Sequence, residues 1–125
     1  MFMLLEEILA DADGVGPVFQ LGEQRGKLLI LTLGVTHITE LDSVLISIWG
    51  SLDGKAWGLT PLVSLPPKYY CGLYSASLNL ASSPDLRYLR VHWHVRRSKG
   101  YAKHDPACGF YVSVAASGSR VSAVA

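Results

Sequence analysis

Long apolar runs, charge and export signals are all scarce in this sequence. No run approaches the roughly 20 apolar residues that a membrane-spanning helix needs, so no membrane span is expected. Only 17% of residues are charged and the formal net charge is +1, which argues against nucleic acid as a partner. The first residues lack the basic start of a signal peptide, and Glu6 and Glu7 interrupt their apolar stretch. These observations predict a soluble protein without a signal peptide, in an unknown location.

Cysteine is also rare, and its two positions exclude the common cysteine motifs. Cys71 and Cys108 are far apart, and neither belongs to a CxxC pair, so a zinc or thioredoxin-like site is poorly supported. They could form one disulfide or remain reduced. We favour two buried, reduced thiols, because nothing marks the chain as secreted.

Recognisable catalytic motifs are missing as well. Serine is plentiful, but no G-x-S-x-G elbow occurs, and most acidic residues lie in turns or near the termini. Glu40 and Asp42 lie beside His37 and could transfer protons, although a hydrophilic connection between strands explains them equally well. No acid, base and nucleophile can be assembled with defined roles. We therefore expect a protein that is not an enzyme and has no cofactor.

The sequence does contain short apolar segments of β type separated by turn residues. The 125 residues are half apolar, enough for one domain with its own core. In Val44–Gly50 both alternating faces are apolar and β-branched residues dominate, which is typical of a strand covered on both sides. Asp53-Gly54 then supplies a reversal, and we expect Trp57 to fold back over the end of this strand.

Further strands are expected at 18–21, 27–36, 59–65, 69–80, 86–97 and 110–114. The segment 27–36 should be central, whereas the prolines around 59–65 place that segment at an edge or in a loop. The pattern predicts an all-β fold, a two-sheet antiparallel β-sandwich of jelly-roll type with about eight strands. Residues 1–15 would be an N-terminal arm or edge strand, 16–115 the sandwich, and 116–125 a flexible tail of small residues.

The strand at 86–97 carries the most informative side chains. Its period of two places polar and ring-bearing residues outward, and they form a candidate contact surface: Tyr88, Arg90, His92, His94 and Arg96. A solvated strand face explains this row, and so does a basic surface for phosphates, anionic sugars or an acidic partner. A His-x-His pair also permits a metal site, with His92, His94 and His104 as weak candidates and Asp105 or His37 as additional ligands. No metal is expected.

Two short stretches carry a family resemblance. Ile48–Trp57 (IWGSLDGKAW) and Pro84–Val91 (PDLRYLRV) resemble the S-x-DG-x-x-W … RYLRV pattern of discoidin-like and other galactose-binding-like β-sandwiches. They are still more similar to short, single-domain jelly-roll proteins of tailed-phage structural gene clusters. The resemblance covers roughly 16–114 and implies an eight-stranded sandwich of two antiparallel sheets.

Two functions follow as expectations. The first is a non-enzymatic structural protein that assembles with copies of itself or decorates another structural protein, as a shell, ring or filament subunit. Low charge and apolar surface favour it, and a virion-associated or extracellular assembly would fit. The second is a carbohydrate-binding module of discoidin-like type, in which Tyr70 and Tyr101 stack on a glycan.

Overall fold

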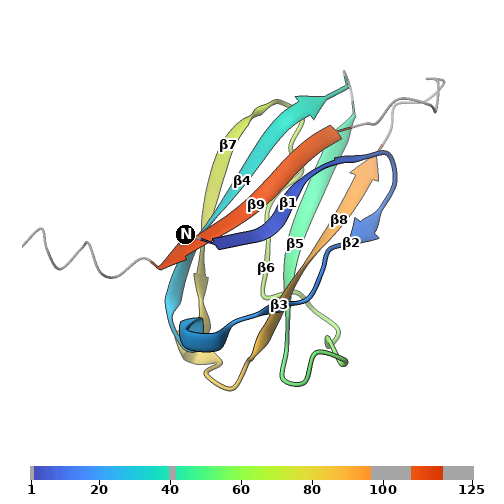
Figure 1. Cartoon of the computed structure of the whole chain (residues 1–125). Helices are drawn as coiled ribbons and strands as arrows, with labels where there is room; N and C mark the ends of the chain where they lie inside the picture. Colours follow the sequence, from blue (N-terminus) through green and yellow to red (C-terminus); the bar gives the residue numbers. More distant parts are fainter. Residues whose placement is uncertain (1, 40–41, 97–107, 117–125) are drawn as a thin grey trace, which may run out of the picture.

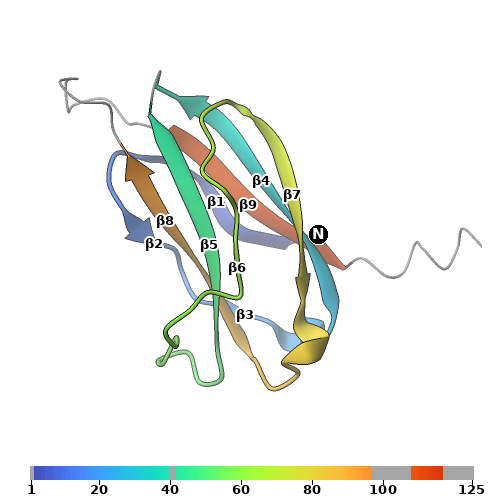
Figure 2. The ribbon, with the colours of Figure 1, turned by 180° about the vertical axis from the view of Figure 1, so that it is seen from behind.

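The computed structural model describes residues 2–39, 42–96 and 108–116, which form two antiparallel sheets packed face to face (Figures 1 and 2). The strands are β1 Phe2–Ala10, β2 Gly14–Val15, β3 Phe19–Gln20, β4 Leu28–Ile38, β5 Ser43–Ser51, β6 Val63–Ser64, β7 Gly72–Asn79, β8 Tyr88–Arg96 and β9 Cys108–Ala116. Two single-turn 3-10 helices, η1 Gly22–Gln24 and η2 Leu80–Ser82, complete the described elements. The predicted all-β sandwich is confirmed.

The strand order identifies the winding of the chain. Sheet A has the order β1-β9-β4-β7, and sheet B has the order β2-β8-β5-β6 with β3 also paired to β8. If β2 and β3 are taken as one interrupted strand, every connection except β5 to β6 crosses from one sheet to the other. Neighbouring strands in a sheet are therefore mostly distant in sequence. This is a jelly-roll winding, open at its edges and not closed into a barrel.

The core lies between the sheets and follows from the period of two along each strand. On the sheet B side Val44, Ile46 and Ile48 of β5 face inward with exposed fractions of 1% or less. From sheet A, Leu31 of β4 and Phe110 of β9 meet them and are equally buried. The alternation expected in 86–97 and 110–114 is confirmed, since Leu89, Val91 and Val112 are buried. The expectation that 44–50 is covered on both sides is wrong, because Leu45 and Trp49 lie on the outer face of sheet B and are only partly buried.

Strand positions within the sheets agree with their composition. β4 lies between β9 and β7, so the expected central position of 27–36 is confirmed. The proline-bounded segment 59–65 contributes only the two-residue β6, at the edge of sheet B. Proline cannot donate to a ladder, and Pro61, Pro66 and Pro67 therefore keep this edge short.

Trp93 of β8 contacts the backbone at the start of β2. Its Nε1 donates to the carbonyl oxygen of Ala12 at 3.1 Å, and its ring meets Phe110 edge-on at 5.7 Å between centroids. A Cβ at Gly14 would lie 2.6 Å from the Trp93 ring, so only glycine allows the backbone so close. This contact fixes the position of Asp13, between Ala12 and Gly14.

The expectation of two buried thiols is wrong for one of them. Cys108 is fully buried in β9, but Cys71 is exposed, and no disulfide joins these two described residues. Cys71 directly precedes β7 at an edge of sheet A, where neither sheet covers its side chain. The described ranges contain no helix that is long and apolar enough to cross a membrane.

Candidate functional site

The outer face of sheet B gathers the aromatic and basic side chains. β5 and β8 pair in an unbroken register, so each outward residue of one strand lies opposite an outward residue of the other. The outward pairs are Ser43 with Arg96, Leu45 with His94, Ser47 with His92, Trp49 with Arg90 and Ser51 with Tyr88. The predicted contact row on β8 is therefore brought together on one face, beside a tryptophan and three buried serines of β5.

Four side chains on this face stack on one another, and we call them the stacked cluster: Trp49, Trp57, Arg90 and His92. The rings of Trp49 and His92 lie 4.9 Å apart at 21°, and the Arg90 guanidinium lies 4.3 Å from the Trp57 ring centroid. Trp49 Nε1 also donates to Ser47 Oγ at 3.0 Å. Trp57 thus folds back toward this face, as expected, and its contact is with Arg90 of β8.

The stacked cluster favours the neutral form of His92. Partial burial lowers the pKa of His92, and the positive charge of Arg90 lowers it further, with a smaller effect from His94. Arg90 Nε donates to His92 Nε2 at 3.4 Å, a long hydrogen bond that requires an unprotonated Nε2. The cluster therefore presents the Arg90 charge beside an imidazole that is harder to protonate than a free one.

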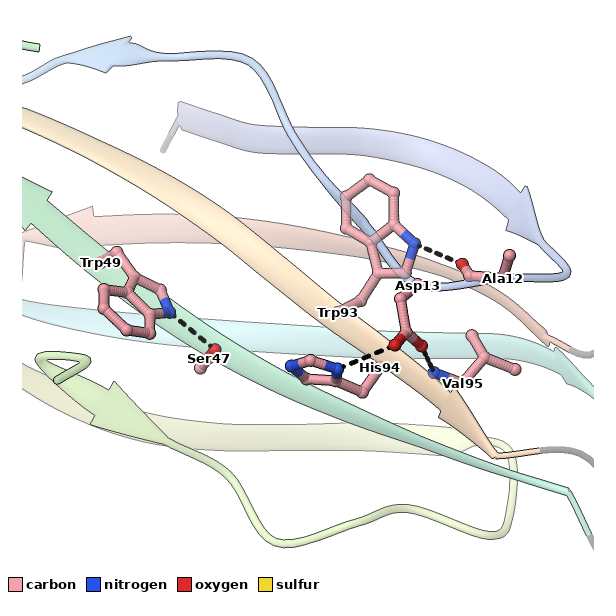
Figure 3. Close-up of polar contacts among 7 residues, drawn as sticks. All are labelled: Ala12, Asp13, Ser47, Trp49, Trp93, His94 and Val95. Carbon is pink, nitrogen blue, oxygen red and sulfur yellow. Dashed lines mark hydrogen bonds and ion pairs between the residues drawn. The ribbon is translucent and has the colours of Figure 1, made fainter. Parts of the chain in front are cut away.

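Asp13 joins the end of this face from a distant part of the sequence (Figure 3). Its Oδ1 accepts from the Val95 backbone N–H at 2.8 Å and its Oδ2 lies 3.1 Å from His94 Nδ1. The Val95 N–H lowers the pKa of the Asp13 carboxyl, and the His94 hydrogen bond lowers it further. Both side chains of this ion pair are more than half exposed, so the pair orients His94 and adds little stability.

Beside this ion pair lies an open pocket with a volume of about 650 Å³, which is within the size range of small-ligand sites. We call it the Asp13 pocket. Its lining combines a carboxylate, an imidazole, a guanidinium and a phenol with apolar side chains: Asp13, Ser43, Leu45, Pro67, Tyr69, His94, Val95 and Arg96. Such a lining can donate hydrogen bonds to hydroxyl or carboxylate groups and can accept them from hydroxyl groups.

The predicted sugar-stacking residue Tyr70 is not among the described residues that line the Asp13 pocket. Tyr70 is 76% exposed and its carbonyl oxygen accepts from Tyr74 Oη at 2.7 Å, while its neighbour Tyr69 lines the pocket instead. Tyr101, His104 and Asp105 lie outside the described residues.

The histidines do not converge on a metal site within the described ranges, where no three His, Cys, Asp or Glu side chains group together. His92 is stacked on Trp49 and His94 is paired with Asp13, so the two rings have different partners. His37 belongs to β4, in the opposite sheet.

The outer face of sheet A has a different character. Along β4, β7 and β9 its outward positions over residues 28–34, 73–79 and 111–115 hold only uncharged side chains: Leu28, Ile30, Thr32, Gly34, Leu73, Ser75, Ser77, Asn79, Tyr111, Ser113 and Ala115. Leu73 is 72% and Leu28 44% exposed. In β1, Glu7 accepts a hydrogen bond from Thr36 Oγ1 at 2.6 Å. We call the uncharged outward positions of β4, β7 and β9 the sheet A face.

Sequence patterns did not identify two residues on the outer face of sheet B, Asp13 and Trp49. Asp13 was assigned to a turn, and its partner His94 is 81 positions away, so no local pattern could join them. Trp49 was missed because its strand was expected to be covered on both sides, which left no outward face for a site. The period of two in 44–50 and 86–97 contained the signal, because it sends Trp49 and Arg90 outward on strands that later prove to be neighbours.

Comparisons of the chain with protein-family profiles, with curated protein sequences and with solved structures found no match.

Proposed function

We propose that this protein is a non-enzymatic structural subunit that assembles with copies of itself or decorates another structural protein. The observation that carries the proposal is the sheet A face, a continuous run of uncharged outward positions across β9, β4 and β7 on which Leu28 and Leu73 are exposed. The charged Glu7 lies outside this run, on the neighbouring strand β1. Surfaces that become buried between subunits are depleted in charge, and an exposed apolar surface gains free energy when it is covered.

The jelly-roll winding supports the same proposal at the level of fold. It is compatible with the resemblance of Ile48–Trp57 and Pro84–Val91 to short phage-type structural proteins, and with a virion-associated or extracellular assembly. Since one fold hosts many functions, the winding is only supporting evidence. The sheet A face remains the stronger argument.

The first test is native mass by light scattering after size exclusion, at low salt and at about 1 M salt. We expect a mass well above the 13.6 kDa of one chain at both, because contacts between uncharged surfaces are not screened by ions. Arg96→Glu, on the outer face of sheet B, is the control and should leave the mass unchanged. A 13.6 kDa species throughout, or an assembly that dissociates in salt, would contradict the proposal.

A carbohydrate-binding module is the second candidate, and the Asp13 pocket favours it. Tyr69 offers a ring for stacking beside the polar groups of Asp13, His94 and Arg96, and aromatic rings pack against apolar ligand surfaces while polar groups fix their orientation. This would be a galactose-binding-like function on the opposite face of the sandwich from the assembly contact. Tyr70, exposed beside Tyr69, would contribute at the rim.

Screening on a glycan array followed by calorimetry tests this second candidate. Tyr69→Ala should weaken binding by about tenfold, equivalent to ~1.4 kcal/mol. Tyr70→Ala is the matched comparison, because Tyr70 is the adjacent residue and lies outside the pocket lining, and we expect a smaller effect. If the wild-type protein bound no glycan, or Tyr69→Ala left binding unchanged, this candidate would be rejected.

A further inference from the structure

The β7 strand forms a long and regular edge of sheet A. It spans eight residues and, among the described strands, pairs on one side only. Its partner is β4, in a register without interruption from Leu28 opposite Asn79 to Val35 opposite Gly72. The other edge strand of this sheet, β1, has two register shifts. Regular edges are templates for pairing with another strand, whereas irregular ones are poor templates.

The direction of the free backbone groups follows from one hydrogen bond. Leu80 N donates to the Lys27 carbonyl oxygen at 2.9 Å, directly after the last β7 pair. In an antiparallel ladder the hydrogen-bonded positions alternate, so Gly72, Tyr74, Ala76 and Leu78 point their backbone groups toward β4. The N–H and C=O groups of Leu73, Ser75, Ser77 and Asn79 therefore point away from the sheet, along its open edge.

This edge lacks the features that usually prevent strand pairing. Gly72–Asn79 contains no charged residue and no proline, although lysine, proline, bulges and short length are the common protections of an edge. Sheet B shows the contrast among the described strands, since its edge strands β2 and β6 have two residues each. The regular edge is also continuous with the sheet A face.

We propose that β7 pairs antiparallel with β7 of a second copy about a two-fold axis at Ala76. This inference rests on the proposed function and names its contact. The register that uses every outward backbone group places Leu73 opposite Asn79 of the second copy and Ser75 opposite Ser77 of the second copy. Ala76 then faces its own equivalent, where side chains approach most closely and a small residue fits. The two four-stranded sheets become one continuous sheet.

A second copy suits this edge because the edge is complementary to itself. An uncharged strand meets its own copy without like-charge repulsion, and a two-fold axis matches each donor with an acceptor. On the outer surface the Ser75 and Ser77 hydroxyls come opposite each other across the axis, at a distance where serine pairs hydrogen bond.

Two charge variants of the full chain test the register. Ser75→Lys/Ser77→Lys places lysine opposite lysine across the axis, and Ser75→Glu/Ser77→Glu places glutamate opposite glutamate. Each variant alone should lose the β7 contact and show a lower native mass than the wild type. An equimolar mixture should recover a mixed pair, because opposite charges then face each other. Both positions are exposed in the single chain, and circular dichroism should confirm that each variant is folded.

The matched control places two lysines on β4, the strand that pairs with β7. Ile30 pairs with Ser77 and Thr32 with Ser75, so Ile30→Lys/Thr32→Lys places the same charges in the same rows of β4, within the sheet A face. This variant should keep the β7-paired species of two chains, and any further loss of mass would come from contacts through the sheet A face. If this control dissociated while Ser75→Lys/Ser77→Lys did not, subunits would meet through the sheet A face and the β7 inference would be overturned, with the proposed function intact. A wild-type protein of 13.6 kDa would reject both.

Discussion

At the residue scale, the turn after β5 depends on one carboxylate. Asp53 Oδ1 accepts from the N–H groups of Lys55 and Ala56 at 2.8 and 3.0 Å. Ser51 Oγ lies 3.1 Å from the same oxygen and accepts in turn from the Gly54 N–H at 2.8 Å. The Ala56 and Lys55 backbone donors, followed by Ser51, lower the pKa of Asp53 from 3.8 to about 2.

We predict that Asp53 stays ionised down to a pH of about 2. Because the folded-state pKa is lowered, its contribution to stability is present above the unfolded value of 3.8 and is lost as the pH falls through about 2. Carboxyl chemical shifts followed by NMR during an acid titration measure this directly. An Asp53 midpoint near 3.8 would show that the turn does not form in solution.

The second residue-scale prediction concerns His92. Arg90→Gln removes a cation beside the imidazole, so the pKa of His92 should rise toward 6.5, with burial still holding it below that value. In the wild type, stability should decrease as the pH falls below 6.5, since the unfolded chain takes up the proton more readily. The NMR chemical shifts of the His92 ring protons, followed during a pH titration, measure the change in its pKa. Arg87→Gln is the control, and an equal shift in both variants would contradict the stacked arrangement.

At the element scale, Gly34 of β4 leaves room for the Tyr111 side chain of the neighbouring strand β9. A Cβ at Gly34 would lie 2.3 Å from the Tyr111 ring, so the ring crosses directly over the glycine. Gly34→Ala should displace the ring and cost about 1–3 kcal/mol, as overpacking does. Chemical denaturation measures this cost. In a Tyr111→Ala background the same substitution should cost much less, and an undiminished cost would place the strain in the backbone.

The strands illustrate how much of the fold could be predicted. In β8 the alternation of Leu89 and Val91 with Arg90 and His92 gave both the strand and its inward face, because periodicity is a local property. Strand order is not local, so nothing in the sequence placed β8 between β2 and β5. The Asp13 pocket was missed for the same reason, whereas the outward row of β8 was found.

At the scale of the whole molecule, the two outer faces differ in chemistry. The sheet A face holds no charged side chain, while the outer face of sheet B carries Arg90, Arg96 and the histidines. They lie on opposite sides of a two-layer sandwich (Figures 1 and 2). A copy bound along sheet A would therefore leave the Asp13 pocket open, and assembly and ligand binding could occur together.

Deleting residues 1–13 should unfold the molecule as a whole. Leu4 and Leu5 of β1 are only 2% and 4% exposed, and truncating one buried leucine costs about 2–5 kcal/mol. Losing both approaches the roughly 5–15 kcal/mol that stabilises a typical domain. Thermal unfolding should show no cooperative transition in this variant. Deleting residues 117–125 is the control, because it leaves every described strand in place. A cooperative transition after the longer deletion would show that β1 is dispensable.

β9 is paired with β1 on one side and with β4 on the other, which has a consequence for biosynthesis. A ribosome delivers β9 after every other strand, so until residues 108–116 emerge, β1 has no neighbour and sheet A is only the β4–β7 pair. Core leucines and the uncharged β7 edge are then exposed together on the nascent chain. Closure of the sandwich is thus delayed until residues 108–116 have emerged, and strand-rich folds with such distant pairings fold slowly. The interval before β9 arrives is when this protein most needs a chaperone.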